Sequence, residues 1–452
     1  MTVKAIMPVR KVNLVAPLDH ESTDRHTTDT AASVRAASGA APTLIGKSLR
    51  GGSLHSATGT PPTPGIATST TATRTTTTRA TKAVPCPSAD PYLFHALLQA
   101  YLDCRRTKRN SASAQAFEAQ AEQNLYALHE ELANGTYRPG RSICFVITRP
   151  RPREVWAAEF RDRIVHHLLY NHVAPRFHAS FVADSCACIP GRGTLYAARR
   201  LEQQVRSITQ NWSQPASYLK CDLANFFVSI DKTVLMTMLA RKVSEPWWQA
   251  LAETILMHDP RADVDVRGSR RELALVPSHK SLFNAPDRHG LPIGNLSSQF
   301  FANVLLDGLD QHIKHRVRAP HYVRYVDDFV LLHEDRQWLR SAHASIEQRL
   351  SELHLQLNPR KTILQPVSRG IDFVGHLIKP WRRTTRARTV AAALHRIAEA
   401  PPTDVHQATN SYFGLLLQAT HSHADRARLA KAIQRRGHCV NAALTKTYRR
   451  SS

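Results

Sequence analysis

The chain has 452 residues, enough for roughly two or three structural units with a substantial core. Sixty lysines and arginines against 36 aspartates and glutamates give a formal net charge of +24. This favours a nucleic-acid partner over a polybasic membrane-surface protein, because the basic residues are spread along the chain among core-like segments. The seven cysteines lack the spacing of a disulfide framework, which predicts a reduced cytoplasmic protein. No apolar run reaches about 18 residues, which argues against a membrane span.

The first 88 residues differ in composition from the rest of the chain. The first aromatic residue is Tyr92, and no acid occurs from Ala31 to Ala89. Threonine is frequent there, with glycine and proline scattered through the segment. Such a segment buries too little apolar surface to offset the entropy lost on ordering, so residues 1–88 are predicted to form a disordered basic tail.

Helical periodicity begins near Pro91. Apolar residues recur at three- and four-residue spacing from Leu93 to Tyr101 and again from Phe117 to Leu132. Residues 142–148 then predict a strand, and a basic turn over 149–153 leads into a second strand or the next helix.

Three acids further along the chain lie in unusual settings. A largely apolar strand ends at Asp222, and Asp327 and Asp328 form the tip of a predicted hairpin over residues 321–333. Adjacent carboxylates repel each other, so both stay ionised and close only beside a strong cation, and hard oxygen ligands suit Mg²⁺ or Mn²⁺. An isolated Asp-Asp pair is more often an exposed acidic turn. With a third carboxylate, the set can hold two metal ions about 4 Å apart, as in enzymes of in-line phosphoryl transfer.

These acids belong to motifs that resemble those of reverse transcriptases. Tyr-Val-Asp-Asp at 325–328 and the Asp-x-x-x-Phe-Phe pattern at 222–227 are similar to two catalytic motifs of the palm in that family. Residues 290–303 are similar to the motif that positions template and nucleotide. Within it, Ile-Gly-Asn-Leu-Ser-Ser-Gln at 293–299 resembles the enzymes of diversity-generating retroelements and of related uncharacterised or anti-phage bacterial groups.

The resemblance implies an α+β chain with a right-hand polymerase fold. After the disordered tail, we expect N-terminal helices and fingers in 89–215, a palm with an antiparallel sheet in 216–380, and a helical thumb in 381–452. Further expected helices cover residues 297–315 and 339–353, and in the thumb 388–400, 405–420 and 424–446. The thumb would follow the minor groove of the duplex.

The resemblance also assigns site residues by position. It implies metal binding by Asp222, Leu223, Asp327 and Asp328, with two Mg²⁺ ions or Mn²⁺ as cofactor, and catalysis by the three acids. Phe227 would exclude a ribose 2′-hydroxyl and so select deoxynucleotides, although an aromatic residue on a strand is often core. Lys361 would donate a proton to pyrophosphate, or it is a solvated lysine. The nucleotide-binding set is Phe227, Arg192, Ile293, Gly294, Gln299 and Lys361.

The sequence departs from the family at two of these positions. The arginine that usually touches the triphosphate is replaced by Ile189, and Arg192 in a glycine-flanked loop is the candidate substitute, the alternative being a solvent-exposed arginine in a turn. Most family members carry glutamine at the position of Ile293, whereas the diversity-generating group carries an aliphatic residue and copies adenines with errors. An isoleucine packs but makes no side-chain hydrogen bond, so either it relaxes fidelity or it fills an apolar gap.

Arginines are the candidates for contact with nucleic acid. The set is Arg151, Arg153, Arg161, Arg163, Arg382 and Arg383. Arg161 and Arg163 face different directions on a helix, so one of them could instead pair with Asp162 or Glu154.

The sequence therefore predicts an RNA-directed DNA polymerase with template RNA, primer or cDNA, and dNTPs as partners, and no membrane. Diversity generation, with a small accessory protein, is the expected role, and anti-phage defence is the alternative. A catalytically weak RNA-binding scaffold and an RNA-dependent RNA polymerase are more remote; the intact acids argue against the first and Phe227 against the second.

Overall fold

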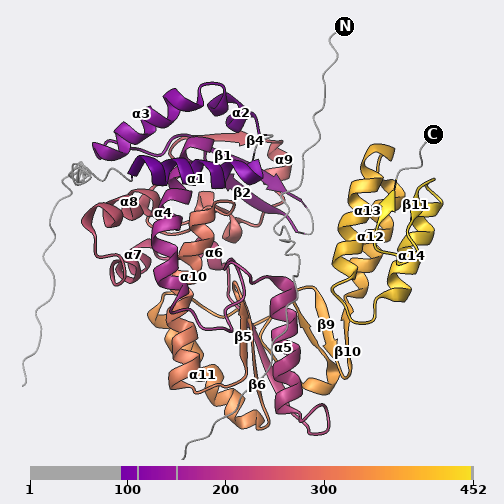
Figure 1. Cartoon of the computed structure of the whole chain (residues 1–452). Helices are drawn as coiled ribbons and strands as arrows, with labels where there is room; N and C mark the ends of the chain where they lie inside the picture. Colours follow the sequence, from indigo (N-terminus) through magenta and orange to yellow (C-terminus); the bar gives the residue numbers. More distant parts are fainter. Residues whose placement is uncertain (1–92, 109–110, 149–150, 449–452) are drawn as a thin grey trace, which may run out of the picture. The chain divides into compact units, whose positions relative to one another are not determined.

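The computed structural model describes residues 93–108, 111–148 and 151–448, all within the compact unit Lys82–Ser452 (Figure 1). The tail predicted for residues 1–88 lies outside the described residues. The described part combines helices with small sheets, as the α+β prediction requires. None of its helices has both the length and the apolar character needed to cross a bilayer.

The first described elements are helices packed beside a three-stranded sheet. Helix α1 lies against α4, and Leu97, Leu128 and Leu168 are buried between the helices. The sheet has the order β2-β1-β4, with β1 antiparallel to β2 and parallel to β4. The bounds are α1 (Leu93–Lys108), α2 (Ala112–Glu118), α3 (Ala121–Ala133), β1 (Ser142–Ile147), β2 (Arg153–Ala157), α4 (Phe160–His178) and β4 (Val264–Arg267).

A four-stranded antiparallel sheet of order β5-β6-β3-β7 holds the three acids. Its side chains alternate between two cores, which is the period of two expected of a strand. Phe329 and Leu331 face the core that contains α10 and α11, whereas Val330 and Leu332 face the core that contains α5. The bounds are α5 (Thr194–Ile208), β3 (Ser217–Asp222), α10 (Leu296–Gln311), β5 (Tyr322–Tyr325), β6 (Asp328–His333), α11 (Arg336–Glu352) and β7 (Ile363–Pro366).

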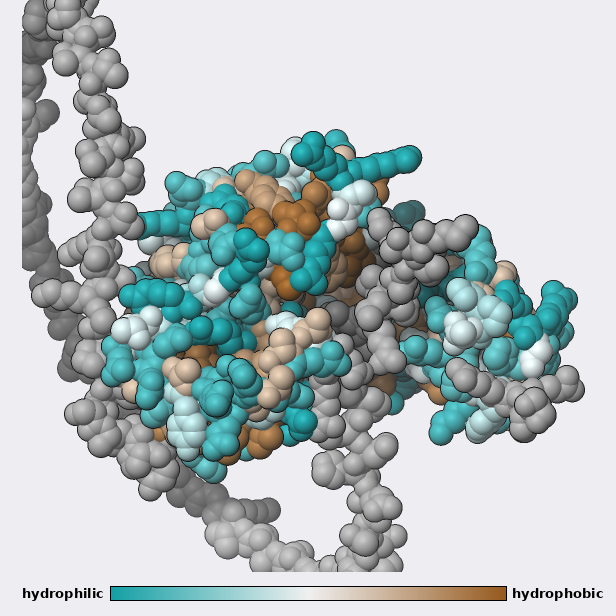
Figure 2. Space-filling view, turned by 90° about the horizontal axis from the view of Figure 1, so that it is seen from above, coloured by the Kyte–Doolittle hydropathy of each residue, from teal (hydrophilic) through white to brown (hydrophobic). Residues whose placement is uncertain are grey.

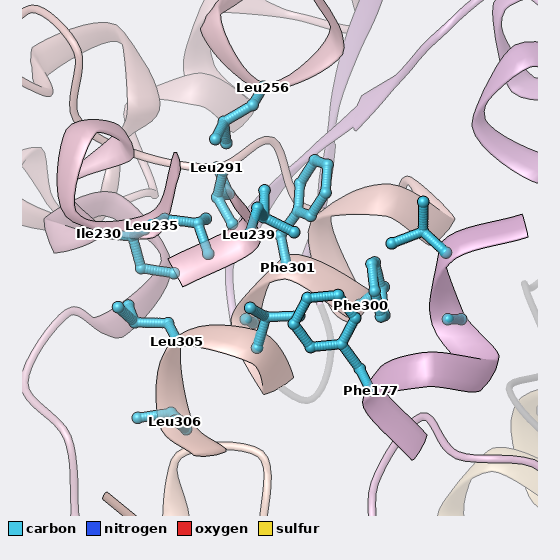
Figure 3. Close-up of a cluster of buried hydrophobic side chains, with 14 of the residues drawn as sticks. Phe177, Ile230, Leu235, Leu239, Leu256, Leu291, Phe300, Phe301, Leu305 and Leu306 are labelled. Atoms are coloured by element: carbon cyan, nitrogen blue, oxygen red, sulfur yellow. The ribbon is translucent and has the colours of Figure 1, made fainter. Parts of the chain in front are cut away.

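Helix α10 is central to the larger core. Figure 3 shows Phe300 and Phe301 of α10 among Phe177 of α4, Leu239 and Leu291. This packing fixes the loop that precedes α10, because Leu291 belongs to that loop. The remaining elements of this region are α6 (Phe226–Ser229), α7 (Lys232–Ala240), α8 (Pro246–Met257), α9 (Arg270–Leu273), short 3₁₀ turns at Ser278–Lys280, Leu282–Asn284 and Val367–Arg369, and a π-helical turn at His312–Arg316.

The C-terminal region begins with the sheet β8-β9-β10 and continues into three helices with their own core of Ile397, Phe413 and Ile433. The helix predicted over 424–446 is wrong in its second half. Helix α14 ends at Gln434, and Gly437 has a φ of +78°, the left-handed conformation that commonly ends a helix. The bounds are β8 (Ile371–Phe373), β9 (His376–Lys379), β10 (Arg382–Thr385), α12 (Ala387–Glu399), α13 (Pro402–Leu416), α14 (His423–Gln434), β11 (Cys439–Val440) and β12 (Thr447–Tyr448).

Candidate active site

The three acids meet at one end of the four-stranded sheet. Strands β5 and β6 form a hairpin in which Tyr325 pairs with Asp328 across the two-residue turn Val326-Asp327. Asp222, the last residue of β3, lies directly opposite Asp328 in the register of β3 and β6. The Leu223 amide donates to the Asp327 carbonyl at 3.1 Å, which joins the two segments beyond the ladder. Side chains that are separate in sequence therefore share one sheet end.

Burial and mutual repulsion act on two of these carboxyl groups. Burial raises the pKa of Asp327 to about 6, and the charge of Asp222 adds to the rise. Burial also raises the pKa of Asp328 to about 6, against the opposing effect of Lys220. The Oδ1 atom of Asp328 is buried and has no hydrogen-bond partner. A buried acceptor without a partner costs free energy. A cation bound here would lower that cost and would stabilise the ionised form of the carboxyl groups.

Two lysines lie against the acids. The Lys361 Nζ atom donates to both carboxylate oxygens of Asp222, at 2.6 and 2.7 Å. The Lys220 Nζ atom lies 3.1 Å from Asp328 Oδ2 and donates to the Asp372 carbonyl at 2.6 Å. The sequence prediction included Lys361 but missed Lys220. Strand alternation could have identified Lys220, because residues two apart on β3 face the same side and Lys220 is two before Asp222.

The carboxylates are suited to hard cations, and the lysine contacts define the present arrangement. Among the described residues, no three His, Cys, Asp or Glu side chains lie together as a ready metal site. The Asp222 oxygens are directed to Lys361, and one Asp328 oxygen is directed to Lys220. The unpartnered Oδ1 of Asp328 and the carboxylate chemistry of the set fit Mg²⁺ or Mn²⁺, so the two-metal prediction for Asp222, Leu223, Asp327 and Asp328 stays a prediction.

Arg324 holds the β5–β6 hairpin from within the core, and the sequence did not predict this role. Its side chain is 1% exposed. The guanidinium pairs with Asp310 of α10 through Nε at 2.7 Å and Nη2 at 2.6 Å. The remaining donors go to Asn303 Oδ1, Ser185 Oγ and the Val326 carbonyl at 2.8–3.1 Å, so all five donors are satisfied. Val326, a β-branched residue, has a φ of +57°, a strained conformation that this contact helps to hold.

Phe227 is half-buried and packs against the larger core, whereas its neighbour Phe226 is fully buried in that core. The two rings meet edge to face, with centroids 5.2 Å apart. Asn225 precedes them with a φ of +47° at the start of the short helix α6. The predicted role of Phe227 at the nucleotide sugar stays a prediction.

The loop at 290–295 is held by protein contacts. The Leu291 amide donates to the Phe227 carbonyl and the Trp156 amide to the Ile293 carbonyl, both at 2.7 Å. Gly294 has a φ of +130°, and a Cβ atom there would lie 2.8 Å from the Trp156 carbonyl oxygen. The absence of a side chain at Gly294 therefore lets the loop lie against the backbone of β2. The side chains of Ile293 and of Gln299, on the first turns of α10, are half-buried.

A small cavity of about 20 Å³ lies beside this loop, lined by Asp162, His166 and Asn295 among others. That volume holds about one water molecule, so the cavity is not the nucleotide site.

Arg192 is occupied by backbone contacts. Its Nη1 atom donates to the carbonyls of Val182 and Ser185 at 2.8 and 2.7 Å. The guanidinium also lies over the Tyr196 ring, 5.9 Å from its centroid. Ile189 is buried in the core. The alternative of a solvent-exposed Arg192 is therefore wrong. The predicted contact with phosphate would use the guanidinium donors of Arg192 that do not bind these carbonyls.

The predicted nucleic-acid arginines divide into exposed and internally paired residues. Arg151, Arg153 and Arg382 are exposed. Arg161 pairs with Glu131 at 2.5 Å and also lies 3.8 Å from Asp162, so the predicted pairing is found with Asp162 and not with Glu154. Arg163 is half-buried. Arg383 is a correction: its side chain is 6% exposed, and its guanidinium binds Glu202 and donates to the Gln418 carbonyl. Its charge is neutralised inside the protein, so it has no free face for a phosphate.

Comparison with known families gives an independent result. Residues 150–378, just over half of the chain, match the family model described as reverse transcriptase (RNA-dependent DNA polymerase). The matched span contains the four-stranded sheet, all three acids and both lysines. No curated protein matches the chain.

Proposed function

Because the chain belongs to the reverse transcriptase family and is an RNA-directed DNA polymerase, we propose that Asp222, Asp327 and Asp328 are the centre of its nucleotidyl transfer. The observation that carries this proposal is the register of β3 and β6, which sets Asp222 opposite Asp328 beside the turn at Asp327. The raised pKa values of Asp327 and Asp328 support it, because strongly shifted carboxyl groups gather at functional sites.

Divalent ions, when bound, would activate the primer 3′-hydroxyl and neutralise the leaving pyrophosphate. Asp222, Asp327 and Asp328 would hold these ions, together with the backbone at Leu223. Lys361 is proposed as the proton donor to pyrophosphate, and its contact with Asp222 supports this role because it places the ammonium group at the carboxylates. The Lys361 ammonium would donate a proton to an oxygen of the departing pyrophosphate.

Sugar selection is proposed for Phe227. Its half-buried ring, five residues after Asp222 and in edge contact with Phe226, would contact the nucleotide sugar and clash with a 2′-hydroxyl. The same ring disfavours an RNA-dependent RNA polymerase, which needs room for that hydroxyl.

Primer extension on an RNA template with dNTPs and Mg²⁺ tests the carboxylate proposal. We expect Asp222→Ala and Asp327→Ala to lose several orders of magnitude in rate, as on removal of other principal electrostatic groups. Asp404→Ala, an exposed acid on α13, is the matched control and should extend like the wild type. Full extension by folded Asp327→Ala would overturn the mechanism.

For the biological role we propose diversity generation, with defence against phage as the second candidate. Ile293 carries this proposal. Its half-buried side chain lies in the loop 290–295, which backbone hydrogen bonds join to Phe227 and Trp156. This side chain offers no hydrogen bond to a nascent base pair. Template RNA, a DNA primer or cDNA, and a small accessory protein are the proposed partners.

Single-nucleotide insertion opposite template adenine tests the role of Ile293. We expect Ile293→Gln to lower misincorporation relative to correct insertion, because the amide restores a polar contact at the pair. Ile293→Leu is the control, since it stays apolar and keeps the backbone bond to Trp156. Equal error ratios in all three proteins would refute both the fidelity role and the diversity-generating assignment.

A further inference from the structure

The turn between β9 and β10 presents a tryptophan to solvent. Lys379 pairs with Arg382 across this hairpin, which leaves Pro380 and Trp381 as a two-residue turn. Trp381 is 60% exposed, more than any other large hydrophobic residue in the described part of the chain. Its φ is +64°, which is unfavourable for a bulky side chain. An exposed indole in a strained turn contributes little to the stability of the fold, which points to a role in binding a ligand.

Cations surround this tryptophan. Lys379 and Arg382 flank the turn, and Arg369 is next to Gly370, where an added Cβ would lie 3.0 Å from the Lys379 Cγ atom. Arg369 and Arg382 are exposed, and no ion pair joins any of the three cations to an acid in the described ranges. The adjacent Arg383 differs, because Glu202 neutralises it. The turn therefore carries a net positive charge with free donors.

The turn lies at the end of β9 that is remote from the acids. Lys220 contacts both Asp328 and the Asp372 carbonyl, so the β8–β9 connection is at the catalytic end. From His376, opposite Phe373, strand β9 runs away from that end to Lys379. Four strand residues span about 13 Å, so Trp381 is separated from the reaction centre by roughly that length. Figure 1 shows β9 and β10 side by side near α5.

We propose that Trp381, with Lys379, Arg382 and Arg369, is a second RNA contact that binds single-stranded RNA outside the primer–template duplex. The indole would stack on an unpaired base, and the cations would bind the neighbouring phosphates. An aromatic face stacks on any base. This contact therefore recognises that the RNA is unpaired and does not recognise its sequence. The proposal rests on the proposed function only in taking RNA as the template.

Charge and composition favour RNA over other partners for this turn. The cluster combines one exposed aromatic ring with three cations, which is the combination of a stacking ring and phosphate-binding side chains found in single-stranded nucleic-acid sites. An anionic membrane surface would also attract the cations and the tryptophan, so membrane binding is one of the outcomes that the test distinguishes. Figure 2 shows that hydrophilic residues dominate the face it displays, with apolar residues in smaller patches.

The test compares Trp381→Ala with Tyr448→Ala, an exposed aromatic residue on the distant hairpin β11–β12, in the full chain. Two probes are used: a long unstructured RNA, and a short primer–template with no single strand beyond the duplex except the templating base. We expect Trp381→Ala to weaken binding of the long RNA about tenfold, within the range for loss of one stacked base. Tyr448→Ala should bind like the wild type, and dNTP incorporation on the short primer–template should be unchanged in both variants.

Charge is tested separately with Lys379→Ala and Arg382→Ala. Each should lower the slope of log Kd against log salt for the long RNA by about one unit, because each removes one phosphate contact. Trp381→Phe should recover most of the affinity, which a purely structural role of the indole would not predict.

Equal affinity of wild type and Trp381→Ala for the long RNA would overturn the proposal. Trp381-dependent binding to vesicles of phosphatidylserine and phosphatidylcholine, without an effect on RNA, would overturn it in favour of a membrane contact. Absence of nucleotide incorporation by the wild type would refute the proposed function instead, since RNA binding is measured independently of synthesis.

Discussion

At the scale of residues, the proposed reaction centre combines three acids with two lysines, which contact the carboxylate oxygens of Asp222 and Asp328. Asp327 and Asp328 have a pKa of about 6, well above the ordinary value of 3.8. In the folded protein these groups bind protons more tightly than in the unfolded chain. Without metal, they therefore destabilise the fold above about pH 6, and this penalty disappears as the pH falls toward 4.

Asp327→Asn should therefore stabilise the metal-free protein while abolishing synthesis. A shift from 3.8 to about 6 corresponds to roughly 3 kcal/mol at neutral pH, so we expect a gain on the order of 1–3 kcal/mol in the free energy of unfolding. Urea unfolding at about pH 7.5 and about pH 4.5 measures it, and the gain should shrink at the lower pH. Mg²⁺ should raise the melting temperature of the wild type but not of the variant. A variant no more stable than the wild type at either pH would contradict this explanation.

Sequence motifs predicted the acids, Phe227 and Lys361, because each stands at a fixed spacing from a recognisable pattern. They did not predict which arginines are internal. Arg382 and Arg383 are adjacent in a basic run, and only the register of β10 turns one outward and the other toward Glu202. Burial of a charge depends on a partner that is distant in sequence, which the local pattern does not contain.

At the scale of elements, the hairpin of β5 and β6 depends on Arg324. Strand propensity predicted the hairpin, but the motif gave no reason for an arginine in its buried strand. The reason is the set of five acceptors on three segments: Asp310 and Asn303 of α10, Ser185, and the turn carbonyl of Val326.

Arg324→Met should destabilise the protein by about 3–5 kcal/mol, because it removes the only charged partner of buried Asp310 and leaves that carboxylate with the Tyr322 hydroxyl alone among its described side-chain partners. Arg340→Met, on the exposed side of α11, should change the free energy of unfolding by less than about 0.5 kcal/mol. Arg324→Lys supplies fewer donors, so it should fold but need more Mg²⁺ for half-maximal extension, since the turn at Asp327 is held less well. Urea unfolding and Mg²⁺ titration are the measurements. An unchanged Mg²⁺ requirement in Arg324→Lys would show that the network supports stability alone.

Most long helices could be predicted from periodicity to within a few residues, as α10 and α11 show. Long-range pairings could not. Strand β4 joins β1 in parallel across more than a hundred residues, and the short segment Val264–Arg267 carries no local pattern that names this partner. Such pairing is decided by tertiary contacts and not by local propensity.

At the scale of the whole molecule, the net charge of +24 and the matched family agree on a nucleic-acid substrate. The division into fingers, palm and thumb remains a prediction, as does the disordered tail. The central claim is that the chain makes DNA on RNA with the carboxylate centre and a sugar gate at Phe227.

Extension of a DNA primer on an RNA template, with dNTPs and rNTPs competing in one reaction, tests this claim most directly. The account predicts an alkali-resistant product from the wild type. It predicts a product with many more alkali-labile sites from Phe227→Val, because the smaller side chain leaves room for a 2′-hydroxyl. An alkali-labile product from the wild type, or the same ratio of dNTP to rNTP incorporation in both proteins, would contradict it.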